Sequence, residues 1–188
     1  MSISYTSVAG TTNIAGHIYQ SKAGTDTWTT NRFCTKFDTS TVIPTIDQIT
    51  SVKLYLKVTA VTGTDNYILT SGISTTSNWG VAVNATNEDF ISTADTSEGT
   101  TSASSTGWKS WAIDKNNLDL AGETWFKLKG STEYQASTIN ITFASQGNAT
   151  AGDRPYLEIT YTVAGGVVKK QIVFARFRRG VTRRWYQN

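Results

Sequence analysis

The residues of this sequence that could act as acids, bases or nucleophiles are few and widely spaced. His17 is the only histidine and Cys34 the only cysteine. A hydrolase needs a nucleophile with a base, two facing carboxylates or a metal ion, and a zinc site needs several Cys or His ligands at close spacing. The sequence has no phosphate-binding loop, no Gly-x-Ser-x-Gly motif and no dinucleotide fingerprint. We therefore expect no enzyme activity, no cofactor and no metal ion.

One cluster of oxygen ligands is an alternative to that expectation. The stretch AIDKNNLDL places Asp114, Asn116, Asn117 and Asp119 on one predicted loop. Carboxylate and amide oxygens are ligands that Ca²⁺ accepts, but the stretch lacks the full EF-hand pattern and its glycine. Calcium binding by this loop is the less favoured hypothesis, and the absence of a metal ion is the favoured one.

Two tryptophans, Trp108 and Trp111, lie three residues apart in GWKSWAID. On a strand, residues three apart face opposite sides, so one ring can enter the core while the other is exposed. An exposed Trp is a flat apolar platform with a polar N–H, which suits stacking against a sugar. Trp108 and Trp111 are therefore the candidate glycan-binding residues.

The charge of the chain is unevenly distributed. Residues 1–168 hold ten Lys or Arg against fourteen Asp or Glu, a formal charge of −4, whereas residues 169–188 hold seven Lys or Arg and no acid. Apolar and aromatic residues are mixed with these cations. The residues of this segment that we expect to make contacts are Lys169, Lys170, Ile172, Phe174, Arg176, Phe177, Arg178, Arg179, Arg183, Arg184, Trp185 and Tyr186.

The composition of this basic segment is compatible with four roles. Arginines with interleaved aromatics could neutralise phosphates and stack on bases, a membrane surface could attract the cations, and a charge run is often a solvated tail or a simple extension of its domain. We favour an assembly arm, residues 165–188, that begins at a hinge at Gly165-Gly166 and adds a strand to a neighbouring protein. Its β-branched and aromatic side chains need burial, and its arginines would select carboxylates. Nucleic acid is the weaker partner, and no membrane contact is expected.

Residues 1–164 have the pattern of an all-β domain. SVKLYLKVTAV alternates Val52, Leu54, Leu56 and Val58 with polar residues, which predicts a strand with one buried face. TINITFAS, PYLEITYTV and ETWFKLKG alternate in the same way. We estimate eight or nine strands, which favours a β-sandwich, and we expect residues 92–107 to form a polar surface loop that could take part in glycan contacts.

Three stretches resemble the DNRLRE-type jelly-roll domain, a β-sandwich found in large surface proteins, in carbohydrate-binding modules and in virion proteins of bacteriophages. They are RFCTKFDTSTVIPTIDQITSVKLYL, INITFASQGN and DRPYLEITY, and the resemblance covers residues 1–163. It implies a jelly-roll-like antiparallel sandwich. The matching elements are Arg32, Phe33, Phe37, Asp38, Ser40, Pro44, Ile49, Ser51, Lys53, Leu54, Leu56, Arg154, Pro155 and Leu157.

The resemblance and the basic segment together predict a structural protein of a tailed bacteriophage particle, such as a capsid decoration, head fibre or tail accessory protein. Its partners would be other virion proteins and copies of itself, bound through the C-terminal arm. The sequence starts at Met1 with no export signal, so we expect synthesis in the host cytoplasm and assembly into the virion. The alternative is a carbohydrate-binding module that recognises cell-surface glycans.

Overall fold

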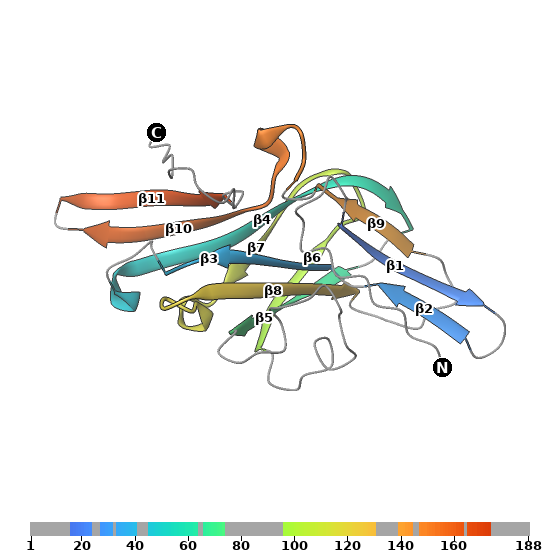
Figure 1. Cartoon of the computed structure of the whole chain (residues 1–188), viewed down its shortest axis with the longest axis horizontal. Helices are drawn as coiled ribbons and strands as arrows, with labels where there is room; N and C mark the ends of the chain where they lie inside the picture. Colours follow the sequence, from blue (N-terminus) through green and yellow to red (C-terminus); the bar gives the residue numbers. More distant parts are fainter. Residues whose placement is uncertain are drawn as a thin grey trace, which may run out of the picture.

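The fold is all-β, as the alternating segments predict (Figure 1). The computed structural model describes residues 16–23, 27–31, 33–40, 45–63, 66–73, 96–130, 139–144, 147–163 and 165–173. Its strands are β1 (Gly16–Ala23), β2 (Thr27–Asn31), β3 (Phe33–Asp38), β4 (Ile49–Thr62), β5 (Asn66–Ile73), β6 (Thr96–Ser102), β7 (Gly107–Ile113), β8 (Glu123–Gly130), β9 (Ile139–Phe143), β10 (Tyr156–Val163) and β11 (Gly166–Val173). The helices among these residues are three 3-10 turns, η1 (Ile46–Gln48), η2 (Lys115–Asn117) and η3 (Ala151–Asp153), and none is long and apolar enough to cross a membrane.

The strands form two antiparallel sheets. The larger sheet has the order β11-β10-β4-β9-β1-β2, with β7 also paired to β4, and the smaller sheet has the order β3-β8-β5-β6. The long strand β4 pairs with β7, β10 and β9 and so organises the larger sheet. Segments far apart in the sequence are thereby brought onto one surface.

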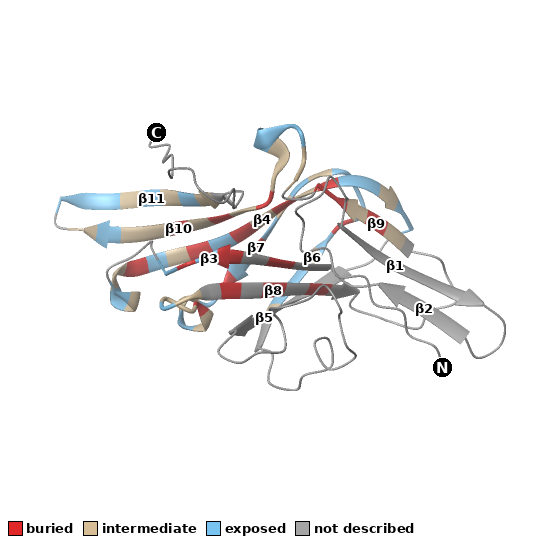
Figure 2. Cartoon of the chain, viewed as in Figure 1, coloured by how far each residue is buried: buried red, intermediate tan, exposed pale blue. Residues whose placement is uncertain are grey.

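One hydrophobic core receives side chains from both sheets. Val52, Leu54, Leu56 and Val58 of β4 are all buried, which confirms the predicted inward face of that strand (Figure 2). The same core contains Phe126, so the two sheets share a buried interior, as a β-sandwich requires. Loss of a large buried side chain from such a core costs about 2–5 kcal/mol.

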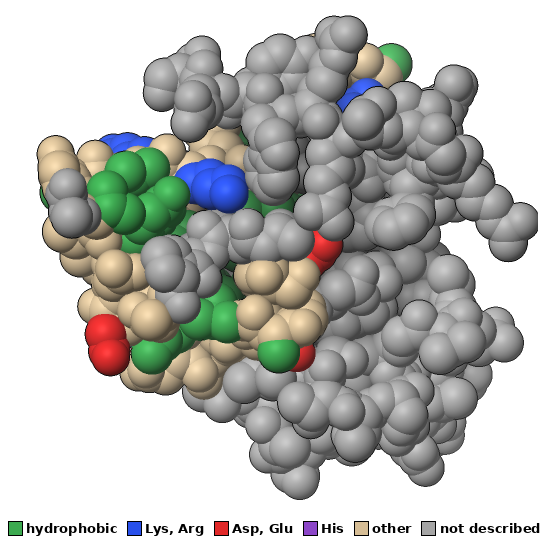
Figure 3. Space-filling view, turned by 60° about the vertical axis from the view of Figure 1, so that its left-hand side comes forward, with side chains coloured by type: hydrophobic (Ala, Val, Ile, Leu, Met, Phe, Trp, Pro, Cys, Tyr) green, Lys and Arg blue, Asp and Glu red, His purple; other side chains and the backbone are tan. Residues whose placement is uncertain are grey.

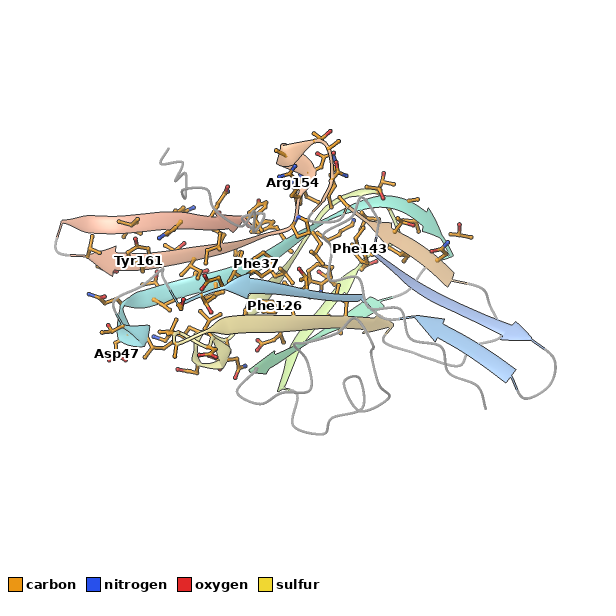
Figure 4. All side chains as sticks on the ribbon, in the orientation of Figure 1. Phe37, Asp47, Phe126, Phe143, Arg154 and Tyr161 are labelled. Atoms are coloured by element: carbon orange, nitrogen blue, oxygen red, sulfur yellow. The ribbon has the colours of Figure 1, made fainter. Side chains whose placement is uncertain are left out.

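Aromatic packing anchors the smaller sheet in this core. Phe37 on β3 and Phe126 on β8 meet edge to face, with ring centroids 5.8 Å apart (Figure 4). Leu157 and Ile159 on β10 are fully buried in the same cluster, as the alternation in PYLEITYTV predicts. The jelly-roll connectivity stays a prediction.

A buried polar cluster joins the end of β3 to the turn before β8. Thr39 and Thr124 are both buried, and their hydroxyl oxygens lie 2.8 Å apart. The backbone N–H of Asp119 donates to the Thr124 hydroxyl at 2.9 Å, and the Thr39 hydroxyl lies 3.1 Å from the carbonyl oxygen of Gly122. These bonds satisfy polar groups that would otherwise be costly to bury.

Two strands lie where the sequence suggests none for this domain. Residues 96–102 form β6 instead of part of a loop, because an edge strand that pairs on one side with β5 needs little apolar surface. Residues 166–173 form β11, which pairs along its whole length with β10 instead of leaving the domain. Residues 16–163 thus contain ten described strands instead of the eight or nine estimated for residues 1–164, and β11 follows them.

Candidate functional site

The strand β7 separates the two candidate tryptophans as their spacing predicts. Trp111 is 2% exposed and pairs across to Leu54, so it belongs to the core. Trp108 is 40% exposed on the opposite face of the larger sheet. Trp111 therefore cannot offer its ring to a ligand, which corrects its assignment as a glycan-binding residue, and Trp108 alone retains that role as a candidate.

Trp108 belongs to a group of three aromatic rings that spans three strands. Its ring meets the ring of Tyr156 on β10 at a centroid distance of 5.3 Å and an interplanar angle of 63°. Tyr156 in turn stacks on Tyr55 of β4, with centroids 4.7 Å apart and planes 12° apart. We call Trp108, Tyr55 and Tyr156 the aromatic face.

The strand register explains why these rings meet. Tyr55 and Tyr156 are directly paired residues of β4 and β10, so their side chains share one face of the sheet. Trp108 is paired with Lys57, two residues along β4 from Tyr55, and is therefore on that face too. Both tyrosines fall on the solvent side of strands whose alternation is clear in the sequence. Their contact could not be predicted, because it depends on which strands are neighbours.

An ion pair borders the aromatic face. Lys57 Nζ lies 2.6 Å from Asp153 Oδ1, and the two side chains are 32% and 27% exposed. Asp153 ends η3, just before β10, and the neighbouring Arg154 donates from Nε to the carbonyl oxygen of Asn148 at 2.8 Å. This bond fixes the loop that presents Asp153. A carboxylate accepts several hydrogen bonds, so the Asp153 side chain retains acceptor capacity for a ligand hydroxyl.

The pKa of the Tyr156 phenol is raised above its ordinary value. Burial raises its pKa above the ordinary value of 10.0, and the nearby Tyr55 and Glu158 raise it further. The phenol is therefore a neutral hydrogen-bond donor and acceptor throughout the physiological range. The aromatic face thus combines apolar ring surfaces with a phenol, a carboxylate and an ammonium group at its border.

The acids of AIDKNNLDL are used by local turns. Asp114 Oδ1 accepts from the backbone N–H of Asn116 at 3.0 Å and caps η2, and Asp119 Oδ1 accepts from the N–H of Ala121 at 2.9 Å. Asn117 donates its side-chain amide to Glu98. Within the part of the chain that the structure describes, no three His, Cys, Asp or Glu residues gather in a way that could hold a metal ion.

The other sequence candidates for chemistry are placed only by their backbones. His17 is on β1 and Cys34 on β3, in different sheets, and their side chains fall outside the description.

The predicted arm divides into two parts. Gly165 and Gly166, both at positive φ, join β10 to β11 at a hairpin turn instead of the expected hinge. On β11, Lys169 is exposed, Ile172 packs against the core and burial lowers the pKa of Lys170. Residues 165–173 thus belong to the domain. The remaining arm residues, Phe174, Arg176, Phe177, Arg178, Arg179, Arg183, Arg184, Trp185 and Tyr186, lie outside the described residues.

Two comparisons with known proteins found no match to this chain. No protein-family model matches the chain, and no curated protein matches it. The resemblance to the DNRLRE-type domain therefore stays a prediction from the sequence.

Proposed function

We propose that this protein is a non-enzymatic structural protein of a virus particle, of the tailed-bacteriophage type, anchored by its C-terminal segment. The observation that carries the proposal is the path of β11. This strand ends at Val173, at the edge of the larger sheet, and the next fifteen residues contain five Arg and no acid. β11 therefore ends before the run of five Arg begins, and we assign that run to contact with a partner.

Charge supports an anchoring role for residues 174–188. The chain up to Val173 contains all fourteen acids and twelve of the seventeen Lys and Arg, so the remaining five cations are concentrated in the segment after β11. Arginine forms bidentate bonds with carboxylates, and the aromatic residues of the segment supply apolar surface. In a particle with many copies, weak individual contacts add through avidity.

The experiment compares incorporation into purified particles. The variants are a chain ending at Val173, a full-length chain with Gln at the five Arg positions after Val173, and a control with residues 174–188 in scrambled order and unchanged charge. We expect mass spectrometry to detect the intact chain in particles. We expect the truncated and Gln variants to be absent from them. If the scrambled control is incorporated into particles, anchoring depends on the charge of the segment. If it is not incorporated, anchoring depends on the order of the residues. Equal incorporation of all variants would overturn the proposal.

A second function is favoured by a separate observation, the exposed ring of Trp108. We propose that the aromatic face binds a glycan on a cell surface. Trp108 keeps 40% of its surface exposed and meets Tyr156 in an edge-type ring contact, so its ring is accessible for stacking and is held by a neighbour. The ion pair of Lys57 and Asp153 lies beside it and can hydrogen-bond sugar hydroxyls. A virion protein can have both functions.

A glycan array tests this second function. We expect binding by the intact protein, loss of binding in Trp108→Ala and partial retention in Trp108→Phe. Val167→Ala is the matched control, because Val167 is exposed on β11 and is not part of the aromatic face. Equal binding by Trp108→Ala and the control would exclude the aromatic face as the glycan site.

A further inference from the structure

The outer side of the larger sheet continues beyond the aromatic face as a row of polar residues. Lys53 on β4 and Glu158 on β10 are directly paired. Each lies two residues along its strand from a tyrosine of the aromatic face, so its side chain is on the same side of the sheet. Glu158 is half-buried, whereas Lys53 is exposed, as is Gln171, which is paired with Glu158 on β11. An accessible surface therefore runs from Trp108 across β4, β10 and β11.

The cations that β4 places on this side of the sheet each lie opposite a carboxylate. Lys57 forms the ion pair with Asp153, and Lys53 is the direct neighbour of Glu158 in the strand register. The nearby Arg154 directs its Nε to a backbone carbonyl of its own loop. A carboxylate or sulfate of a ligand would thus meet ammonium groups that are already matched by acids, and its loss of hydration would not be offset.

Charges elsewhere on the described surface are dispersed. In the view of Figure 3, the Lys, Arg, Asp and Glu side chains stand singly among hydrophobic and neutral polar ones. Lys169 on β11 is exposed and is paired with Thr160, four residues along β10 from Tyr156. It is therefore displaced from the aromatic face by about 13 Å of strand. The exposed ring of Trp108 lies beside charges of both signs rather than beside a cluster of cations.

The polar groups next to that ring match the hydroxyl groups of an uncharged sugar, which both donate and accept hydrogen bonds. Asp153 Oδ1 accepts from Lys57, while its Oδ2 has no hydrogen-bond partner among the described residues and can accept from a ligand hydroxyl. Lys57 Nζ retains N–H groups for donation. Lys53 lies four residues along β4 from Lys57, about 13 Å of strand, which is longer than one sugar ring.

We propose that the aromatic face binds an uncharged, linear oligosaccharide that lies along β4 and β10. This inference rests on the proposed glycan-binding function and names the class of glycan. One sugar stacks its C–H face on Trp108 and bonds its hydroxyls to Asp153 and Lys57. The following part of the chain reaches Lys53 and Glu158.

The test first divides the glycans of an array into uncharged ones and those that carry carboxylates, sulfates or phosphates. We expect the intact protein to bind uncharged glycans, and we expect Trp108→Ala to lose this binding. A preference for the charged group with the same dependence on Trp108 would leave the glycan function standing and make this inference wrong. Binding to neither group would overturn both.

A matched pair of ligands isolates the effect of ligand charge. It consists of the uncharged oligosaccharide that the array shows to bind best and the same chain with its primary hydroxyls oxidised to carboxylates. By isothermal titration calorimetry, we expect the uncharged form to bind about tenfold more tightly or better, and its single sugar to bind more weakly than the chain. Equal affinity for the two forms, or for the single sugar and the chain, would overturn the inference.

Charge variants test the matching of Lys57 by Asp153. Asp153→Asn leaves Lys57 unmatched and should reduce the preference for the uncharged form to about threefold or less. The double variant Lys57→Gln/Asp153→Asn removes both charges and should restore the preference. Asp47→Asn makes the same charge change in η1, which Figure 4 shows well apart from Arg154 and its loop, and should leave both affinities unchanged. An unchanged preference in Asp153→Asn, or an equal change in Asp47→Asn, would contradict the inference.

Discussion

Tyr55 and Tyr156 stack almost parallel across β4 and β10, with ring centroids 4.7 Å apart, and Trp108 meets Tyr156 in an edge-type contact. This contact joins two strands that are far apart in the sequence. It positions an exposed tryptophan on the outer face of the larger sheet, next to the ion pair of Lys57 and Asp153. The relationship is the structural basis for the glycan proposal.

The two tryptophans of β7 should differ in how much stability is lost when each is replaced by alanine. Trp111→Ala removes a ring that is 2% exposed and should lower the free energy of unfolding by about 3–5 kcal/mol. Trp108→Ala removes a partly exposed ring and its contact with Tyr156, which should cost about 1 kcal/mol. Urea unfolding followed by circular dichroism measures both changes. A larger loss in Trp108→Ala would contradict the assigned faces.

Alkaline pH should destabilise the wild-type protein relative to Tyr156→Phe. Burial raises the pKa of Tyr156 in the folded state, so the unfolded chain releases this proton first. The resulting stabilisation is complete below pH 10 and is lost as the pH rises through the folded-state pKa. Unfolding free energies of both proteins between pH 8 and about pH 11 test this linkage. Parallel pH profiles would show that Tyr156 titrates alike in both states.

The hydrogen bonds of the buried Thr124 hydroxyl should contribute more to stability than the volume of its side chain. Thr124→Val keeps the shape of the side chain but leaves the N–H of Asp119 and the hydroxyl of Thr39 without this partner, which should cost about 1–3 kcal/mol. Thr162→Val, at an exposed position of β10, is the control and should change stability by less than about 0.5 kcal/mol. Thermal unfolding of the two variants decides the point, and equal melting temperatures would refute it.

The end of the folded domain should lie at Val173. A chain ending at Val173 keeps β11 and should unfold like the intact protein, whereas a chain ending at Ala164 loses a full strand and the packing of Ile172 against the core. We expect the shorter chain to have a clearly lower melting temperature and faster hydrogen exchange in β10. If the two truncated chains are equally stable, β11 contributes little to the domain and residues 165–188 are better described as one arm.

Local alternation predicts the core, but it does not predict which strands pair. Leu54 and Leu56 are buried as their spacing indicates, since a period of two is a property of each strand alone. The strand character of VVKKQIV is also evident, yet its sequence does not say whether it pairs with β10 or with another protein. Strand β6 was missed because Thr, Ser and Gly dominate it, and an edge strand needs little apolar surface.

The candidate site shows the same division. The exposure of one tryptophan and the burial of the other follow from their spacing on β7. Tyr55 and Tyr156 are placed on the solvent side by the same alternation, but their stacking requires the register between β4 and β10. Asp153 joins the site through a turn, and no periodic pattern in the sequence signals its ion pair with Lys57.

Quantitative mass spectrometry of purified virus particles tests the central proposal most directly. The intact chain and the chain ending at Val173 are expressed at equal levels during particle assembly, and each is quantified against a major particle protein. The proposal predicts a constant ratio for the intact chain and a loss of the truncated chain from particles. Absence of the intact chain, or an equal ratio for both chains, would contradict the proposal that this is a particle component anchored by its C-terminal segment.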